Sequence, residues 1–567
     1  TLLSVTTTGT VTGGDDGIDA RHYGTGDLVI NSANVDGTGS VIGQAHGIFA
    51  ENRSGGASTV TAGNVTSTDD TAIDVSNYAG GDITITTTGT VEGRGGIRAN
   101  DIRTGEITIN ATNADGTASV DGGVSTGIYA GNYTTGALSI AANNVSGGVG
   151  IFASTGTLNT TMTVTTTGTV TGTVFEGIRA EHEGTGDLTI NATNADGTGQ
   201  VTGQSFGIRA ENDGGGALSV SADNVTGTTL IGIFAENAPL VTTDLSVQTT
   251  GTVTAGAYGI VARKQGSGDL TVNSANADDT GSVSGNLGGI LAYNSNGGAT
   301  TLVADRVESR DSIGIRAFNA DASTTSLSVT ASNVTGGTDG VYARNEGTGD
   351  LTVNVSAPDG TGQATGAQTG IDAVNQNGGA LSITADNVTG TNQNGINAYN
   401  AAPGTSLSIT TTGTVSGGDD GIFGINRGTG DLRVNSANAD GTGSVSGATD
   451  GIYVVNFGLT ALNVTADDVS GTAGTGVYTE NTGDGGSAIT TYGTVTGGVR
   501  GIRVTDRGQG DLTVTASNSD GTAQTSGCQF CIIVANYYDG AVTITADNVV
   551  GTAQDGISAR NYASVSA

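Results

Sequence analysis

A four-residue phrase, Gly-Ile-x-Ala, recurs from one end of the chain to the other and constrains the fold more than any other feature. It stands at Gly17–Ala20, Gly47–Ala50 and Gly96–Ala99, and last at Gly556–Ala559. With Val allowed for Ile, and small substitutions at the first and fourth places, there are 21 copies. Their spacings settle into 30, 25 and 26 residues, so that three steps make 81 residues and seven such units make 567. A fixed period of this length indicates repeats that stack on one another.

Each step contains short stretches in which apolar and polar residues alternate. Leu188 and Ile190 face one side of the chain, whereas Thr189 and Asn191 face the other, a period of two that is typical of half-buried strands. Three such strands fit into one step, and clusters of glycine, which occupies 99 positions, separate them and supply residues for tight corners. A chain that makes three strands and three corners before it repeats winds a coil, and stacked coils make parallel sheets.

The expected fold is therefore all-β, a parallel β-helix of about 21 coils in seven 81-residue, three-coil repeats. Residues 1–567 are expected to form a single continuous array, because no proline-rich linker, composition shift or charge block interrupts the series. At about 4.8 Å per coil, such an array would extend on the order of 100 Å.

An asparagine follows the glycine of the phrase by five residues in 15 of the 21 copies. Counted from the buried Ile, this side chain points inward at the end of the strand. Stacked amides there can donate and accept hydrogen bonds from coil to coil, and Asn tolerates a left-handed corner. The predicted ladder includes Asn52, Asn77, Asn132, Asn212, Asn237, Asn294, Asn319, Asn345, Asn375, Asn400 and Asn426.

This ladder resembles the one in the right-handed parallel β-helices of pectate lyases. The Gly-Ile-x-Ala phrase, together with Gly-Thr-Gly-Asp-Leu-Thr-Val at 347–353, looks more like the passenger repeats of bacterial autotransporter adhesins. That resemblance implies a right-handed β-helix outside the cell or on the outer surface of a bacterium. No signal peptide precedes Thr1 and no membrane-barrel strands end the chain, so we expect a processed piece of a longer protein.

The charge balance excludes several classes of partner. With 53 acidic and 19 basic residues the net charge is −34, which repels nucleic acid and anionic lipid surfaces. No membrane-spanning segment is expected in this chain. Because charged residues make up only 13% of the chain and hydrophobic residues 35%, the composition is not that of a disordered acidic tail.

The two outward positions of the Gly-Ile-x-Ala strand, namely x and the residue after Ala, hold about half of all Phe, Tyr and Arg residues. Such residues are typical of interfaces, and we expect them to bind a glycan by stacking, a protein receptor, or copies of the chain. The alternative is that they stack on one another and pair with Glu51, Glu181, Glu211 or Glu236 to stiffen the sheet. The candidate binding residues are Tyr293, Arg316, Phe318, Tyr342, Arg344, Tyr399, Phe423, Tyr453 and Tyr478.

Two recurrent acidic motifs are weaker candidates for chemistry. The Asp of Gly-Thr-Gly-Asp returns only once per 81 residues, about 14 Å apart, which is too far for a catalytic pair or a shared metal. The Asn-Ala-Asp-Gly-Thr loops echo the middle of a calcium loop but lack its closing Glu, so the expected cofactor is none, with calcium as the less favoured alternative. The simpler interpretation is a turn capped by its own side chains.

No catalytic or metal site is expected. Hydrolases and lyases on β-helices need a local, unrepeated cluster of carboxylates, and Asp15–Asp16 and Asp419–Asp420 are interpreted as solvated turn acids. The single lysine, Lys264, is expected at the surface. Cys528 and Cys531 form a CxxC that has no second pair for zinc, and we expect either a small disulfide or two reduced residues.

The function that the sequence favours is a non-enzymatic, extracellular or cell-surface β-helical stalk that mediates adhesion or cell–cell and biofilm association. The first alternative is a subunit of a self-assembling extracellular filament, because the chain begins and stops within the repeat. The second alternative is a polysaccharide-degrading β-helix enzyme.

Overall fold

The computed structural model describes residues 1–34, 39–156, 160–401, 403–438, 441–527 and 529–562. These residues form 61 strands and no helix. The chain divides into two compact units, Thr1–Gly285 (unit 1) and Asn286–Ala567 (unit 2). Both units have the same construction. The prediction that 1–567 forms a single array stays a prediction.

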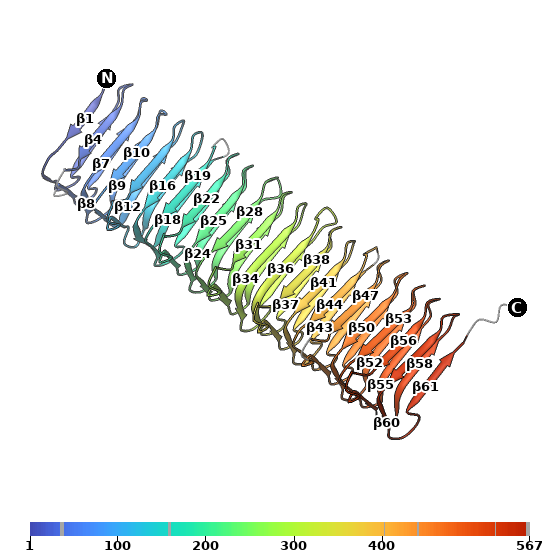
Figure 1. The fold of residues 1–567 in the computed structure, drawn as a ribbon. Helices are drawn as coiled ribbons and strands as arrows, with labels where there is room; N and C mark the ends of the chain where they lie inside the picture. Colours follow the sequence, from blue (N-terminus) through green and yellow to red (C-terminus); the bar gives the residue numbers. More distant parts are fainter. Residues whose placement is uncertain (35–38, 157–159, 402, 439–440, 528, 563–567) are drawn as a thin grey trace. The chain divides into compact units, whose positions relative to one another are not determined.

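Each unit is a parallel β-solenoid whose coils lie side by side (Figure 1). One coil of unit 1 contains β21 (Ile178–His182), β22 (Leu188–Ala192) and β23 (Gln200–Gly203). Each strand pairs with its counterpart in the next coil, in parallel and with like residues in register, as in Ile178 with Ile208 and Leu188 with Leu218. The expected all-β, right-handed parallel β-helix of about 21 coils is confirmed.

The Gly-Ile-x-Ala strands form one sheet in each unit, here called the Gly-Ile sheet. In unit 1 its strands are β3 (Ile18–His22), β6 (Ile48–Asn52), β9 (Thr71–Asn77), β12 (Gly95–Asp101), β15 (Thr126–Asn132), β18 (Val149–Thr155), β21, β24 (Phe206–Asn212), β27 (Ile231–Asn237) and β30 (Tyr258–Lys264). In unit 2 they are β33 (Gly288–Asn294), β35 (Ile315–Asn319), β37 (Val341–Asn345), β40 (Ile371–Asn375), β43 (Ile396–Asn400), β46 (Ile422–Asn426), β49 (Ile452–Asn456), β52 (Thr475–Asn481), β55 (Arg500–Asp506), β58 (Phe530–Asn536) and β61 (Ile557–Asn561).

The second sheet of each unit contains two ladders. The Leu ladder consists of strands such as β22 and the Val ladder of strands such as β23. In unit 2 a single strand supplies both ladders at β34 (Thr300–Ser309) and again at β36 (Leu327–Gly336), which shows that the two ladders belong to one sheet.

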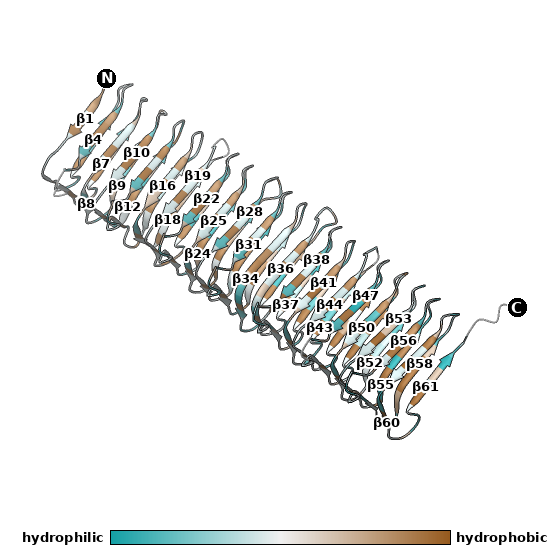
Figure 2. Cartoon of the chain, in the orientation of Figure 1, coloured by the Kyte–Doolittle hydropathy of each residue, from teal (hydrophilic) through white to brown (hydrophobic). Residues whose placement is uncertain are grey.

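The core lies between the sheets, and its residues are those that the period of two predicts. Apolar and polar bands alternate along the strands in Figure 2. In β22, Leu188, Ile190 and Ala192 are buried, whereas the residues between them are half-buried. Because the register repeats, each aliphatic side chain packs on the like side chain of the next coil. This stacking removes apolar surface from water, worth about 25 cal/mol per Å² buried.

The glycine of the phrase is required by close approach and not by an unusual backbone angle. A Cβ added at Gly207 would lie 2.4 Å from Val225 Cγ1 and 2.7 Å from the carbonyl oxygen of Gly232 in the next coil. Positive φ angles occur instead at glycines of the Asp-Gly-Thr loops, for example +73° at Gly197 and +75° at Gly360, and at corners after the Gly-Ile strands, for example +111° at Gly81. Glycine therefore serves two separate purposes in each repeat.

All eleven asparagines of the predicted ladder are fully buried. In unit 2, Nδ2 of Asn319 donates to Oδ1 of Asn345 at 3.0 Å, and the same bond runs from coil to coil up to Asn481. In unit 1, Asn52 and Asn132 donate to glycine carbonyls instead. The amides thus satisfy the corner backbone in both units and bond to one another mainly in unit 2.

Five coils of unit 1 place other residues at the ladder position, namely His22, Asp101, Thr155, His182 and Lys264, and all five are buried. The expectation that Lys264 is a surface residue is wrong, because its side chain is fully buried and Nζ donates to the carbonyl oxygen of Val241 at 3.1 Å. Burial lowers the pKa of Lys264 to about 8, with a partial opposite effect from Asp244 and Asp269. Side chains alternate between the two faces of a strand, so Lys264, four residues after the inward Ile260, also points inward.

A buried acid anchors the loop of the preceding coil. Asp223 is 2% exposed, and its Oδ2 accepts the backbone N–H groups of Asn194 at 2.7 Å and Gly199 at 3.0 Å. Its Oδ1 accepts the hydroxyl of Thr250 at 2.6 Å. Asn143 occupies the equivalent position one repeat earlier, where its Oδ1 accepts the N–H of Asn113.

We predict that Asp223→Ala destabilises unit 1 by about 1 to 3 kcal/mol, because two backbone N–H groups lose their acceptor. Asp223→Asn should stay close to the wild type, as the amide at Asn143 shows. Hydrogen exchange at Asn194 and Gly199 measures the effect directly. Equal exchange in the Ala and Asn variants would show that the side chain does not hold the loop.

Candidate binding face

The outer surface of the Gly-Ile sheet presents two rows of side chains, the first at x of the phrase and the second at the residue after Ala. The nine candidate binding residues, here called the stripe, lie in these rows on unit 2 and are half-buried except for the exposed Arg316. Register places Tyr293 beside Phe318, and Tyr453 between Phe423 and Tyr478. The parallel stacking of coils brings the stripe together.

The rings of the first row lie face to face along the solenoid. Phe423 and Tyr453 have centroids 5.3 Å apart at 8°, and Tyr453 and Tyr478 have centroids 4.5 Å apart at 4°. The guanidinium of Arg503 lies 5.0 Å from the Tyr478 ring centroid. The faces of Tyr453 and Tyr478 are therefore covered by neighbouring coils, so that these rings offer their edges and hydroxyls. Such rings cannot stack on a sugar in the way the sequence suggested.

Arginine covers rings at the other end of the stripe as well. Arg344 lies 5.7 Å from the Phe318 centroid and Arg316 lies 5.8 Å from that of Tyr342. Arg344 also forms an ion pair with Glu346 at 2.6 Å. Cation–π contacts and ion pairs of this kind explain why Arg and aromatic residues gather at the same outward positions.

Unit 1 contains the same cation–π contacts and ion pairs, but its second row has a different composition. Arg179 lies 4.7 Å from the Phe152 centroid and pairs with Glu181. Its second row nevertheless contains no large apolar residue: Arg21, Glu51, Ser76, Asn100, Gly131, Ser154, Glu181, Glu211, Glu236 and Arg263. The second row of unit 2 includes Tyr293, Phe318, Val374, Tyr399, Ile425 and Val455. Since a polar row suffices for the sheet in unit 1, folding does not require the apolar row.

A half-buried carboxylate, Asp372, and a buried one, Asp420, lie beside the residues of the stripe. Burial and the neighbouring Asp339 raise the pKa of Asp372 to about 6, against hydrogen bonding from Asn397 and the charge of Arg344. Burial likewise raises the pKa of Asp420 to about 6. Asp420 is only 7% exposed, and its Oδ1 accepts the N–H of Asp450 at 3.0 Å.

The interpretation of Asp16 and Asp420 as solvated turn acids is therefore wrong. Asp16 accepts the backbone N–H of His46 at 3.0 Å and lies 2.9 Å from its Nδ1. Each acid ties its coil to the next one. The sequence contained a sign of this role, because an acid recurs directly before the Gly-Ile-x-Ala phrase.

The recurrent loop acids cap their own turns. Oδ1 of Asp115 accepts the hydroxyl of Thr117 at 2.7 Å and its N–H at 3.1 Å, and Asp196 and Asp359 do the same with Thr198 and Thr361. Within the described part of the chain, no three His, Cys, Asp or Glu side chains are placed to hold a metal ion. Asp27 and Asp187 accept the N–H of the residue 30 positions later.

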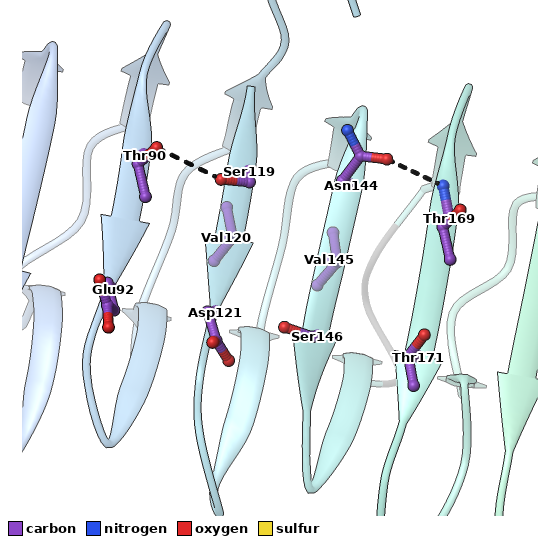
Figure 3. Close-up of a pocket in the computed structure, with 10 residues that line it drawn as sticks. All are labelled: Thr90, Glu92, Ser119, Val120, Asp121, Asn144, Val145, Ser146, Thr169 and Thr171. Atoms are coloured by element: carbon purple, nitrogen blue, oxygen red, sulfur yellow. Dashed lines mark hydrogen bonds between the residues drawn. The ribbon is translucent and has the colours of Figure 1, made fainter. Parts of the chain in front are cut away.

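A shallow hollow of about 380 Å³ lies on the Val ladder of unit 1, over β11 (Thr90–Glu92), β14 (Ser119–Asp121), β17 (Asn144–Gly147) and β20 (Thr169–Gly172). Figure 3 shows Thr90, Ser119, Asn144 and Thr169 along one edge, and Glu92 and Asp121 on neighbouring strands. The two carboxylates are exposed and in register. The hollow offers hydroxyl and carboxylate groups for hydrogen bonds.

The cysteine pair and the expected absence of a membrane span are the remaining sequence-based predictions. Cys531 is buried, which raises the pKa of its thiol, whereas Cys528 lies outside the described residues, so the disulfide stays a prediction. None of the described residues belongs to a helix that could cross a membrane.

Comparison of the chain with known protein families, with characterised proteins and with solved structures finds no match.

We predict that mild acid stabilises unit 2. The pKa of Asp372 is about 6 in the folded chain and 3.8 ordinarily, so the folded state binds more protons between these values and stability rises as pH falls from 6 to 4. Asp372→Asn should remove the part of this dependence that Asp372 contributes, leaving the part due to Asp420, and gain up to about 3 kcal/mol at pH 7.5. Guanidinium denaturation at pH 5 and 7.5 measures both effects.

Asp359→Asn serves as the control, because hydrogen bonds from Thr361 lower the pKa of Asp359. This variant should show no gain at pH 7.5. The prediction would be contradicted if the guanidinium midpoint of the wild type were lower at pH 5 than at pH 7.5 and the Asp372→Asn variant had the same midpoints as the wild type.

Proposed function

We propose that the chain is a non-enzymatic, extracellular or cell-surface β-helical stalk whose stripe makes adhesive contacts with a protein receptor or with copies of itself. The solenoid fold is compatible with a stalk. The observation that supports adhesion is the apolar second row of unit 2. Folding does not require this row, because the corresponding row of unit 1 is polar and the sheet forms there as well.

The geometry of the stripe favours a protein partner over a glycan at this face. Rings such as Tyr453 and Tyr478, with their faces covered, present edges and hydroxyls, and Val374 and Ile425 add half-buried aliphatic groups. A flat strip of this kind complements another flat apolar surface, with polar groups at its rim. The phrase resembles the passenger repeats of autotransporter adhesins, and this resemblance supports an outer-surface location.

We predict that replacing Tyr342, Tyr399, Phe423 and Tyr453 together by Ser weakens the association of cells that display the chain, measured by their rate of settling. The variant removes three rings of the first row and Tyr399 from the second row, which takes away a large part of the apolar contact area. The β-rich circular dichroism should persist, because these side chains point outward.

The matched control replaces Phe49, Tyr129, Phe152 and Phe234 by Ser, which removes similar ring contacts from the first row of unit 1. Cells with this variant should settle like wild type. Unchanged settling with the unit 2 variant would assign the stripe a purely structural role.

A further inference from the structure

The outward positions of the Leu-ladder strands in unit 1 carry no charged residue. Its strands are β1 (Leu3–Thr6), β4 (Leu28–Ser32), β7 (Ser58–Ala62), β10 (Ile83–Thr87), β13 (Ile107–Ala111), β16 (Leu138–Ala142), β19 (Met162–Thr166), β22, β25 (Leu218–Ala222), β28 (Leu245–Thr249) and β31 (Leu270–Ser274). Of 22 outward positions, 15 are Thr or Ser, four are Asn, and the others are Gln248, Val29 and Ala141. On the Gly-Ile sheet of the same unit, 11 of 20 outward positions are charged. We call this surface the hydroxyl face.

The hydroxyl groups of this face are available to a ligand. None of the 15 Thr and Ser hydroxyls forms a hydrogen bond with another residue that the structure describes, for example at Thr84, Thr163 or Ser221. In contrast, the loop hydroxyls of Thr198 and Thr250 bond to Asp196 and Asp223. A hydroxyl both donates and accepts, and so does the amide of Asn or Gln.

Register arranges these groups in straight rows. Thr165, Asn191, Ser221 and Gln248 occupy one row on four successive coils. Neighbours in a row are about 4.8 Å apart, and the two outward residues of one strand are about 6.6 Å apart. Asn191, Ser221 and Gln248 also line a hollow of about 480 Å³, which the loop residues Asn194 and Gly197 border on one side. Asp223 lies in its wall, but this carboxylate is only 2% exposed and already accepts hydrogen bonds from Asn194, Gly199 and Thr250.

We propose that the hydroxyl face of unit 1 binds a neutral polysaccharide, with one sugar seated in the hollow beside Asn194. The net charge of −34 repels anionic polymers. Acids lie only at the border of the face, where for example Asp27 and Asp187 accept backbone N–H groups of the next coil, so its strands offer no charge to a cationic polymer. Sugar hydroxyls donate and accept as the Thr, Ser and Asn side chains do. Weak single contacts add up along the rows, because a polymer engages many of them at once.

This inference does not depend on the proposed function, because the hydroxyl face and the stripe lie on different sheets and different units. The two can therefore fail separately. Loss of settling in the stripe variant says nothing about the hydroxyl face.

The test is retention of the full chain on microcrystalline cellulose, an insoluble neutral polysaccharide, at low and high salt. One variant replaces Thr165, Asn191, Ser221 and Gln248 by Asp. The matched control replaces Thr171, Thr202, Thr226 and Thr254 by Asp, which adds four acids to the same coils on the Val ladder. That ladder already carries Glu92 and Asp121, so the fold tolerates acids there.

We expect the wild type and the control to be retained at both salt concentrations, and the hydroxyl-face variant to lose about tenfold or more in retention. Short cello-oligosaccharides should compete. Absence of wild-type retention, equal retention of both variants, or retention that high salt abolishes would overturn the proposal. Loss of self-association in the variant without loss of cellulose binding would assign the face to contact between copies, and inhibition of ice growth without cellulose binding would assign it to ice.

Discussion

In-register stacking of like residues on successive coils is the constraint on which the whole structure depends. The glycine of the phrase permits it, because a Cβ at Gly207 would meet both Val225 and the backbone of the next coil. Once the coils lie this close, most inward residues have a similar residue above and below them, as Ile178 has Ile151 and Ile208. Aliphatic columns then make the core, amide columns satisfy the corners, and buried acids such as Asp223 and Asp420 tie one coil to the next.

The same constraint leaves the outer faces free to differ. Parallel strands fix the backbone, so an outward side chain changes the surface without changing the core. The second row of the Gly-Ile sheet is polar in unit 1 and mainly apolar from Tyr293 to Val455 in unit 2, and the outward strand positions of the Leu ladder carry no charge in unit 1. We infer that binding functions reside in these differences, on a scaffold that stays the same from repeat to repeat.

Much of this could be predicted from the sequence, because a period of 81 residues and a period of two are both directly visible. The strands, the core and the inward asparagines follow from those periods. The environment of Lys264 could not be read from its charge, since strand parity buries it, and the acid before Gly421 resembles a solvated turn residue until its bond to the next coil is seen. The orientation of the stripe rings also escapes the sequence, because residue type does not tell whether a ring shows its face or its edge.

The most direct test of in-register stacking is oxidation of paired cysteines in a chain whose Cys528 and Cys531 are replaced by Ser. Ser139 and Thr163 are register partners on neighbouring coils, within the Cα separation that a disulfide spans. Ser139→Cys with Thr163→Cys should therefore form a disulfide, whereas Ala141→Cys with Thr163→Cys, two residues out of register, should not. Preferential oxidation of the second pair would contradict the stacking from which every other feature follows.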